Sequence, residues 1–251
     1  MTQEEKAARF QALHEGEPFV IPNPWDAGSA RILAELGFEA LATTSSGFAF
    51  TLGRPDSEAT LGDVTAHVAM LTAATQLPVS VDLENAYEDP AETMRRVAAA
   101  GAVGGSIEDW DGMRLYDVRE AVARLKAALA GARSLEFPFV LTARAENHIR
   151  GNPDLGDTIA RLQAYEEAGA DVLYAPGLAS VDEIRAVCDA VSKPVNVLAR
   201  PHLTAAEIFG AGAQRISIGG ALTWVAVDAF AAAAREIRYG DFSSLDKSSP
   251  F

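Results

Sequence analysis

The stretches that decide the fold of this chain are Val79-Ser80-Val81-Asp82-Leu83-Glu84 and Gly104-Gly105-Ser106-Ile107-Glu108-Asp109. Each is a short apolar run that ends on carboxylates, and such runs are typical of strands in a parallel sheet that is buried on both faces. If the two strands are neighbours, three or four carboxyl groups meet at one edge, where hard oxygen ligands suit Mg²⁺ or Mn²⁺. Either cluster alone could cap the helix that follows it. Two clusters at two strand ends favour a metal site.

Similar apolar runs recur along the chain, with helical spacing between them. They predict eight strands, at residues 19–22, 39–43, 78–82, 104–108, 137–143, 171–174, 194–198 and 215–218. Helices are predicted between them, at 26–36, 89–101, 157–168, 180–191 and 204–209. Eight alternating strands and helices indicate an α/β fold with a single closed (β/α)₈ TIM barrel. An open doubly wound sheet is the alternative, but the turn after the first strand, at 23–26, lacks the glycines of a phosphate-binding turn.

Composition limits the classes of function. The 251 residues are 49% hydrophobic, which suits one domain spanning 1–251 with a short tail from about residue 240. A net charge of −14 disfavours binding to nucleic acid or to anionic membranes. The single cysteine, Cys188, excludes an internal disulfide and fits a reducing cytoplasm. The chain starts without the apolar core of a signal peptide, so we expect a cytoplasmic protein with neither nucleic-acid nor membrane partners.

The chemistry of a TIM barrel lies at the carboxyl ends of its strands. The residues predicted at those ends are Asn23, Trp25, Asp26, Thr44, Ser45, Ser46, Gly47, Asp82, Glu84, Asn85, Glu108, Asp109, Arg144, Glu146, Asn147, His148, Asn196, Arg200 and His202. Arg144 can grip a substrate carboxylate with a two-pronged hydrogen bond, or it can merely neutralise the surrounding acids. The turn at 45–47 can offer free backbone amides to an oxyanion, or it can be an ordinary loop.

The histidines and the cysteine are weaker candidates. His148 and His202 could carry protons near neutral pH, although each alone reads better as a loop histidine. His14 and His67 are expected in exposed helical segments without a role. Cys188 is expected in the middle of a helix as a small buried residue.

Seven motifs occur in an order that is recognisable as a whole. They are Asn-Pro-Trp-Asp-Ala-Gly-Ser-Ala-Arg (23–31), Thr-Ser-Ser-Gly-Phe (44–48), Gly-Arg-Pro-Asp (53–56), Val-Asp-Leu-Glu-Asn-Ala-Tyr (81–87), Ser-Ile-Glu-Asp (106–109), Thr-Ala-Arg-Ala-Glu (142–146) and Pro-Val-Asn-Val (194–197). The chain thereby resembles the isocitrate lyase / phosphoenolpyruvate mutase superfamily, which includes 2-methylisocitrate lyases and phosphonomutases. The resemblance covers nearly the whole chain.

The resemblance implies a (β/α)₈ barrel that forms a homo-oligomer, a dimer or tetramer, whose last helix is exchanged between subunits. It implies Mg²⁺ (or Mn²⁺) and small 2-oxo acid or dicarboxylate ligands. The metal residues it implies are Asp82 as a direct ligand and Glu84 and Glu108 acting largely through water. The catalytic residues it implies are Arg144, Glu108 and Asp82. The substrate-binding residues it implies are Trp25, Ser46, Gly47, Phe48, Arg144 and Asn196.

The chain departs from this pattern after the fourth strand. The superfamily's C–C lyases carry a lid with Lys-Lys-Cys-Gly-His there, whereas this chain has Trp110-Asp111-Gly112-Met113-Arg114-Leu115-Tyr116 and no cysteine. Trp110 also replaces a lysine of the phosphonate-processing members. Three functions stay open: a Mg²⁺-dependent lyase that cleaves a C–C bond in a 2-methylisocitrate- or isocitrate-like acid through an enolate-type intermediate, an oxaloacetate decarboxylase or related 2-oxo acid hydrolase, and a barrel that binds a 2-oxo acid with little turnover.

Overall fold

The computed structural model describes residues 1–245. The strands are β1 (Phe19–Ile21), β2 (Leu41–Ala42), β3 (Val79–Asp82), β4 (Gly104–Glu108), β5 (Val140–Arg144), β6 (Val172–Tyr174), β7 (Val195–Leu198) and β8 (Arg215–Ser217). The helices are α1 (Gln3–Leu13), α2 (Ala27–Glu35), α3 (Ser45–Thr51), α4 (Leu61–Ala74), α5 (Pro90–Ala99), α6 (Val118–Arg133), α7 (Leu155–Ala168), α8 (Val181–Ala190), α9 (Ala205–Gly210) and α10 (Ala221–Arg238). Two short 3₁₀ turns are η1 (Asn147–Ile149) and η2 (Ser243–Leu245).

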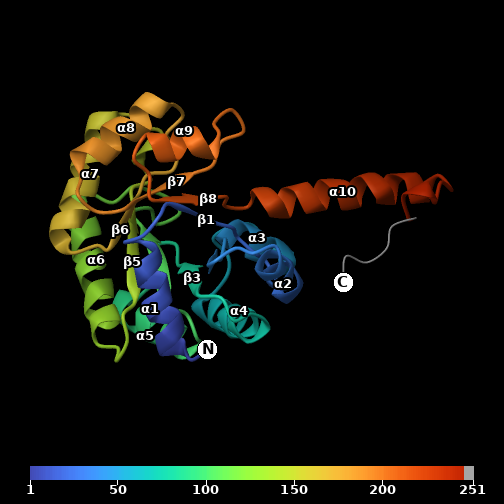
Figure 1. Cartoon of the computed structure of the whole chain (residues 1–251), viewed down its shortest axis with the longest axis horizontal. Helices are drawn as coiled ribbons and strands as arrows, with labels where there is room; N and C mark the ends of the chain where they lie inside the picture. The colour runs from blue at the N-terminus through green and yellow to red at the C-terminus, as the bar shows by residue number, and fades with distance from the viewer. Residues whose placement is uncertain (246–251) are drawn as a thin grey trace.

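The eight strands form one parallel sheet in the order β1-β8-β7-β6-β5-β4-β3-β2, with helices around it (Figure 1). The seam between β1 and β2 is joined by a backbone hydrogen bond of 3.0 Å from the Ala42 N–H to the Pro22 carbonyl. The side chain of Asn23 reinforces this seam, because it donates to the Thr43 carbonyl and accepts from the Ile218 N–H, each at 2.9 Å. The predicted (β/α)₈ barrel is confirmed.

The helices start and stop where local chemistry requires. Asp89 caps α5 by accepting the N–H of Glu92, and Pro90 occupies the first turn, where a missing N–H costs nothing. Gly169 ends α7 with φ +106°, a backbone conformation that favours glycine. The single-domain assignment to 1–251 stays a prediction, and the tail predicted from about residue 240 lies partly outside the described residues.

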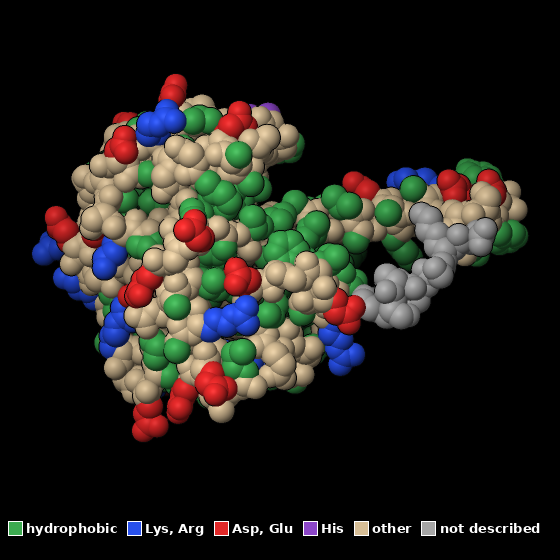
Figure 2. All heavy atoms as spheres, in the orientation of Figure 1, with side chains coloured by type: hydrophobic (Ala, Val, Ile, Leu, Met, Phe, Trp, Pro, Cys, Tyr) green, Lys and Arg blue, Asp and Glu red, His purple; other side chains and the backbone are tan. Residues whose placement is uncertain are grey.

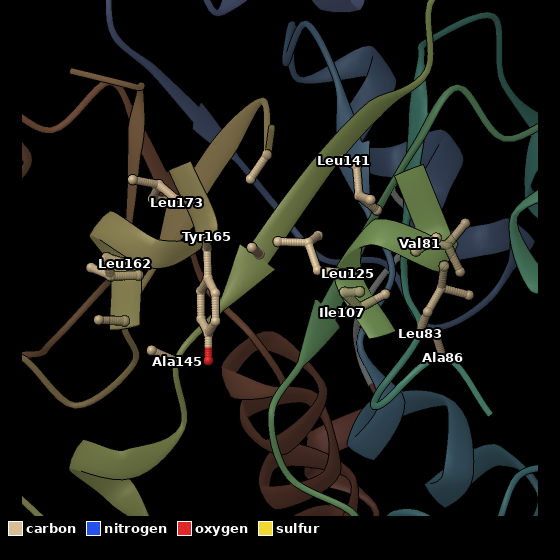
Figure 3. Packing of buried hydrophobic residues seen from close by; sticks show 14 of the residues in the cluster. Val81, Leu83, Ala86, Ile107, Leu125, Leu141, Ala145, Leu162, Tyr165 and Leu173 are labelled. Carbon is tan, nitrogen blue, oxygen red and sulfur yellow. The ribbon is translucent and has the colours of Figure 1, made fainter. Parts of the chain in front are cut away.

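Side chains on the outer surface of the strands pack against the surrounding helices (Figure 3). The strand residues in this layer include Val81, Ile107, Leu141 and Leu173, each at most 5% exposed. Leu125 of α6 and Leu162 of α7 pack in the same cluster. Because side chains alternate along a strand, the intervening residues point into the barrel, where the polar groups of the site lie.

Helix α1 lies across the amino-terminal end of the barrel. Its Phe10 is fully buried in a cluster with Phe19, Val140 and Val172. A Cβ on residue 104 would lie 2.6 Å from the Phe10 ring, so glycine is required there. The first helix therefore closes the bottom of the barrel and leaves the carboxyl end open for chemistry.

The expectation that His14 and His67 are exposed is wrong. His14 is 8% exposed, and its ring packs edge-on against two phenylalanines below the barrel. His67 is 4% exposed and stacks on Phe48 at a centroid distance of 3.9 Å. Both rings are buried because other parts of the chain cover the side on which they lie. The sequence of a helical segment does not show which of its sides will be covered.

Helix α10 projects away from the barrel (Figure 1). Its large apolar side chains remain exposed, with Val225 at 66% and Phe230 at 76%, and Figure 2 shows apolar side chains where it leaves the barrel. No helix in residues 1–245 is both long enough and apolar enough to cross a membrane.

Candidate active site

The two acidic clusters meet at the carboxyl end of the barrel, as predicted, around one arginine. Strands β3, β4 and β5 are adjacent, and Glu108 lies beside Arg144 in the register. The Nη1 atom of Arg144 is 3.3 Å from Glu108 and 3.9 Å from Asp82. Its Nε donates to Glu146, and its guanidinium lies 5.3 Å from the centre of the Tyr174 ring. The Arg144 guanidinium is therefore held in place by three carboxylates and by the Tyr174 ring.

The carboxylates of this site crowd one another. Burial, and then the charge of Asp82, raise the pKa of Glu84 to about 7. Burial raises the pKa of Glu108 as well, against the opposing effect of Arg144. Although its own burial works to lower the pKa of Arg144, the charges of Glu108 and Glu146 outweigh it and raise that pKa. The guanidinium therefore stays charged. The raised pKa values of Glu84 and Glu108 indicate that this one cation does not fully balance the charge of the carboxylates around it.

The segment after β3 carries unusual backbone geometry. Glu84, Ala86 and Tyr87 have φ values of +50°, +67° and +58°, in the left-handed region that residues with a Cβ rarely adopt. The backbone is held there from both sides, since the carbonyl of Glu84 accepts the Glu108 N–H at 2.7 Å and Arg124 binds the Asn85 carbonyl. Such strain is typical of functional sites, and here it falls on Glu84, whose pKa burial and the nearby charges of Asp82 and Arg144 shift.

Two cavities flank this cluster. An inner cavity of ≈ 60 Å³ lies inside the barrel and is lined by Asp82, Arg144 and Asn196, among others. An outer cavity of ≈ 710 Å³ opens beside it and includes Glu84 and Glu108. The predicted catalytic and metal residues thus line one or the other of these two cavities, and Arg144 contacts carboxylates of both.

The predicted turn after β2 lies against the same cluster. The Ser45 N–H donates to Asp82 at 3.1 Å, and the Ser46 hydroxyl is 3.2 Å from that of Thr44. Residue 47 has no room for a side chain, because a Cβ would lie 2.6 Å from the Thr223 hydroxyl of α10.

The two aromatic residues predicted to bind substrate, Phe48 and Trp25, differ in how deeply they are buried. Phe48 is packed in the core against His67, so its packing does not support a contact with substrate. Trp25 is half-buried beside the same turn, and its carbonyl lies 3.0 Å from the His67 ring.

Asp109 does not join the site, which corrects the prediction that its cluster points to the rim as a whole. Its carboxylate accepts from Arg161 at 2.9 Å and from the Tyr165 hydroxyl at 2.5 Å, and it also accepts the Glu146 N–H. Adjacent residues of a strand end face opposite sides of the barrel wall, so Glu108 faces inward and Asp109 outward. Asp109 joins β4, β5 and α7 as a structural residue.

The chain matches the family model described as phosphoenolpyruvate phosphomutase over residues 10–238. It belongs to this family. The predicted membership of the isocitrate lyase / phosphoenolpyruvate mutase superfamily is thereby confirmed, and the chain is an enzyme of that superfamily.

Known proteins agree with this placement. The chain is 30% identical to a 2-methylisocitrate lyase from Halalkalibacterium halodurans, over 86% of this chain and 76% of that one. It is 31% identical to an oxaloacetate decarboxylase from Bradyrhizobium diazoefficiens, over 77% and 70% of the two chains. A crystal structure from Burkholderia cenocepacia J2315, described only as a lyase or mutase, is 51% identical and superimposes with a TM-score of 0.94 over 99% and 93% of the chains.

The loop after β4, where the superfamily's C–C lyases carry their cysteine lid, is a short ordered turn in this member. Trp110 and Leu115 form a β-bridge, and Asp111 accepts the N–H groups of Met113 and Arg114. The Arg150 guanidinium lies 4.9 Å above the Trp110 ring. Asp111 thus binds the backbone of its own loop, and Arg114 ties the loop to Glu120 of α6.

Neither Cys188 nor the loop histidines replace the missing lid cysteine. Cys188 is half-buried on α8, as expected for a helix outside the strands, and burial raises its pKa to about 11. His148 lies near the Thr158 hydroxyl of α7, and His202 lies 2.8 Å from the Ala179 carbonyl. His148 lies in the 3₁₀ turn η1 and His202 in the loop before α9, which agrees with the favoured interpretation of both as loop histidines.

The residues of the inner cavity that were not predicted include Tyr174, Arg215 and Ser217. They occupy alternate positions on β6 and β8, so the spacing of two residues along each strand was the signal that could have found them. Polar side chains at such positions stand where a TIM barrel usually carries branched apolar ones.

The donor set fits a hard divalent ion. Within residues 1–245, no three His, Cys, Asp or Glu side chains come close enough together to enclose a metal directly. Mg²⁺ needs only one or two carboxylates because it keeps several of its waters. The oxygen atoms of Asp82, Glu84 and Glu108, with the raised pKa values of the two glutamates, suit this mode of binding.

Proposed function

We propose that this protein is a Mg²⁺-dependent lyase (with Mn²⁺ as an alternative metal) that cleaves a C–C bond in a small 2-hydroxy or 2-oxo di- or tricarboxylate, such as a 2-methylisocitrate- or isocitrate-like acid. The observation that carries the proposal is the cluster in which Arg144 is held between Asp82 and Glu108 at the edge of two cavities. A cation fixed among acids suits a substrate that develops negative charge on oxygen.

The metal would be held by Asp82 directly and by Glu84 and Glu108 through water. When bound, it would act as a Lewis acid that draws electron density from the oxygens next to the breaking bond. Several kcal/mol of such stabilisation corresponds to roughly a thousandfold or more in rate.

The chain's own residues supply orientation. Arg144 would donate to the developing oxyanion, and its contacts with Glu146 and Tyr174 keep it in place before substrate arrives. Ser46 would help to hold the substrate carboxylate, since its hydroxyl lies 3.2 Å from that of Thr44, which lines the inner cavity with Asp82. Such preorganisation is what makes hydrogen bonds effective in catalysis.

A decarboxylase of oxaloacetate-like acids, or a related 2-oxo acid hydrolase, is the second candidate, and the loop after β4 favours it. That loop has no thiol, and its one carboxylate, Asp111, is occupied by the N–H groups of Met113 and Arg114. Loss of CO₂ from a 3-carboxyl group leaves an enolate that solvent can protonate. This chemistry requires the oxyanion site but no acid on a lid.

The two functions are separated by one experiment. The purified protein with Mg²⁺ is incubated with 2-methylisocitrate, isocitrate, dimethylmalate, oxaloacetate and phosphonopyruvate, and the release of pyruvate, glyoxylate, oxalate, CO₂ and phosphate is followed. Cleavage of a hydroxy acid supports the lyase, and release of CO₂ from oxaloacetate supports the decarboxylase. Binding without any product would leave a 2-oxo acid-binding barrel with little turnover. The cytoplasmic location stays a prediction.

A further inference from the structure

Arg215 is a cation buried inside the barrel without an acidic partner. It is 5% exposed, and within residues 1–245 no carboxylate forms an ion pair with it. Its Nε donates to Asn196 Oδ1 at 2.7 Å, one Nη donates to His14 Nε2 at 3.0 Å, and the other donates to Thr142 Oγ1 at 3.1 Å. The guanidinium is therefore fixed by three neutral acceptors on three different elements.

A guanidinium can only donate hydrogen bonds, so the three atoms that face it must all be acceptors. His14 Nε2 is then unprotonated, which agrees with its Nδ1–H donating to the Phe10 carbonyl at 2.8 Å. The oxygen of the Asn196 carboxamide must face Arg215, and its nitrogen must face the other way. That nitrogen donates to the Ser217 hydroxyl at 2.9 Å.

This orientation decides what Asn196 offers to a ligand. Its Nδ2 atom carries two N–H groups, and one of them has no protein partner in the described part of the chain. Asn196 is 1% exposed and lines the inner cavity together with Asp82 and Arg144. A buried donor on a residue that lines a polar cavity requires an acceptor from a ligand or from water.

We propose that Arg215 is a positioning residue that locks the Asn196 carboxamide so that it presents an N–H group to an anionic oxygen of the bound acid. The identity of that acid rests on the proposed function. Asn196 thereby selects for carboxylate, oxo or alkoxide oxygens in the inner cavity and against hydrogen-bond donors. Arg215 adds positive charge beneath an acid-rich rim and does not touch the acid itself.

Replacing Asn196 by Asp tests the lock, because aspartate has the same shape but offers only acceptors. With Arg215 present, the new carboxylate forms an ion pair with the Arg215 guanidinium. We therefore expect the unfolding temperature of Asn196→Asp to stay within about 2 °C of wild type. In the Arg215→Met protein, the same change buries a carboxylate without a cationic partner. It should lower the unfolding temperature by roughly 5 °C or more relative to Arg215→Met alone. A fall of that size in Asn196→Asp alone would overturn the lock, even if the Arg215→Met proteins fail to fold.

Oxalate, a mimic of the enolate of a 2-oxo acid, tests the donor role. Calorimetric titration in the presence of Mg²⁺ should show an affinity about 100-fold lower for Asn196→Asp, and about tenfold lower for Arg215→Lys, which cannot hold three acceptors at once. Arg133→Met, at a half-exposed arginine on the outer surface, should leave the affinity unchanged. If wild type binds oxalate and Asn196→Asp binds it equally well, the donor role is overturned while the proposed function stands. If wild type does not bind oxalate, the proposed function fails, and the unfolding temperatures alone decide the lock.

Discussion

Asp82 and Asp109 each belong to an acidic cluster at a strand end, yet they face opposite sides of the barrel wall. Asp82 lines the inner cavity near Arg144, whereas Asp109 is buried against Arg161 and Tyr165 outside the strands. Residue type does not distinguish them. The side of the barrel wall that each residue faces distinguishes them, and it supports the proposal that Asp82, Glu108 and Arg144 take part in the chemistry.

The proposed role of Asp82 as a direct metal ligand gives the first prediction. Asp82→Ala should abolish Mg²⁺ binding, because it removes the carboxylate that we propose binds the metal without an intervening water. Calorimetric Mg²⁺ titration in the presence of a 2-oxo acid measures this. Asp111→Ala removes a carboxylate at the edge of the outer cavity and should bind Mg²⁺ like wild type. Unchanged affinity in Asp82→Ala would remove Asp82 from the metal site.

Arg144 gives the second prediction. Arg144→Ala should lower 2-oxo acid affinity or turnover at least about tenfold, since a hydrogen bond to a charged group contributes roughly 1.5–3 kcal/mol. Arg144→Lys should restore only part of the loss, because an ammonium lacks the planar fork. Steady-state kinetics and ligand titration measure both effects. Full activity in either variant would restrict Arg144 to neutralising the surrounding carboxylates.

At the scale of elements, helix α1 does more than cover the bottom of the barrel. Its Phe10 fills the opening, and His14, directly after the helix, accepts a hydrogen bond from Arg215. Burial, and then the charge of Arg215, lower the pKa of His14 from 6.5 to about 3. The neutral ring is therefore part of the connection between α1 and β8.

The third prediction is that acid destabilises the folded protein by protonating His14. Unfolded His14 binds a proton below pH 6.5 and folded His14 does not, so its contribution to stability is complete above pH 6.5 and is lost as the pH falls toward 3. Between pH 6.5 and 5 the loss should be about 2 kcal/mol. Urea unfolding at several pH values measures it. His14→Gln keeps an acceptor and a donor but cannot titrate, and it should flatten the curve. An equally steep curve in His14→Gln would assign the acid sensitivity to other groups.

At the scale of the whole molecule, α10 is a helix with an uncovered apolar surface. Thr223 alone among its residues is buried, while Trp224, Val225 and Phe230 remain exposed. A monomer rarely leaves such a patch in water. We propose that α10 packs against a second copy of the chain, in agreement with the helix exchange that the family resemblance implies.

Phe230→Glu gives the fourth prediction. A charge in the middle of this apolar surface should convert the oligomer to monomers or raise its dissociation constant by at least about tenfold. Light scattering coupled to size-exclusion chromatography measures the mass. Asp228→Asn, an exposed position two residues away on the same helix, should keep the mass of wild type. A monomeric wild-type protein would contradict the packing proposed for α10.

Much of this protein follows from sequence alone. The apolar runs and the residues that cap the intervening helices predict eight strands and a barrel, because burial on both faces and satisfied helix ends are local requirements. The ordered motifs place Asp82, Glu84, Glu108 and Arg144 at one rim, and the structure brings them together.

Only the tertiary structure decides which way side chains face and what covers them. It turns Asp109 outward, stacks Phe48 on His67, and brings Arg215, Asn196 and His14 together from three distant segments. Strand alternation and barrel closure set these contacts, and both depend on neighbours far away in the chain. Local pattern therefore determines the elements and the rim, whereas long-range packing determines which polar groups the rim presents to a ligand.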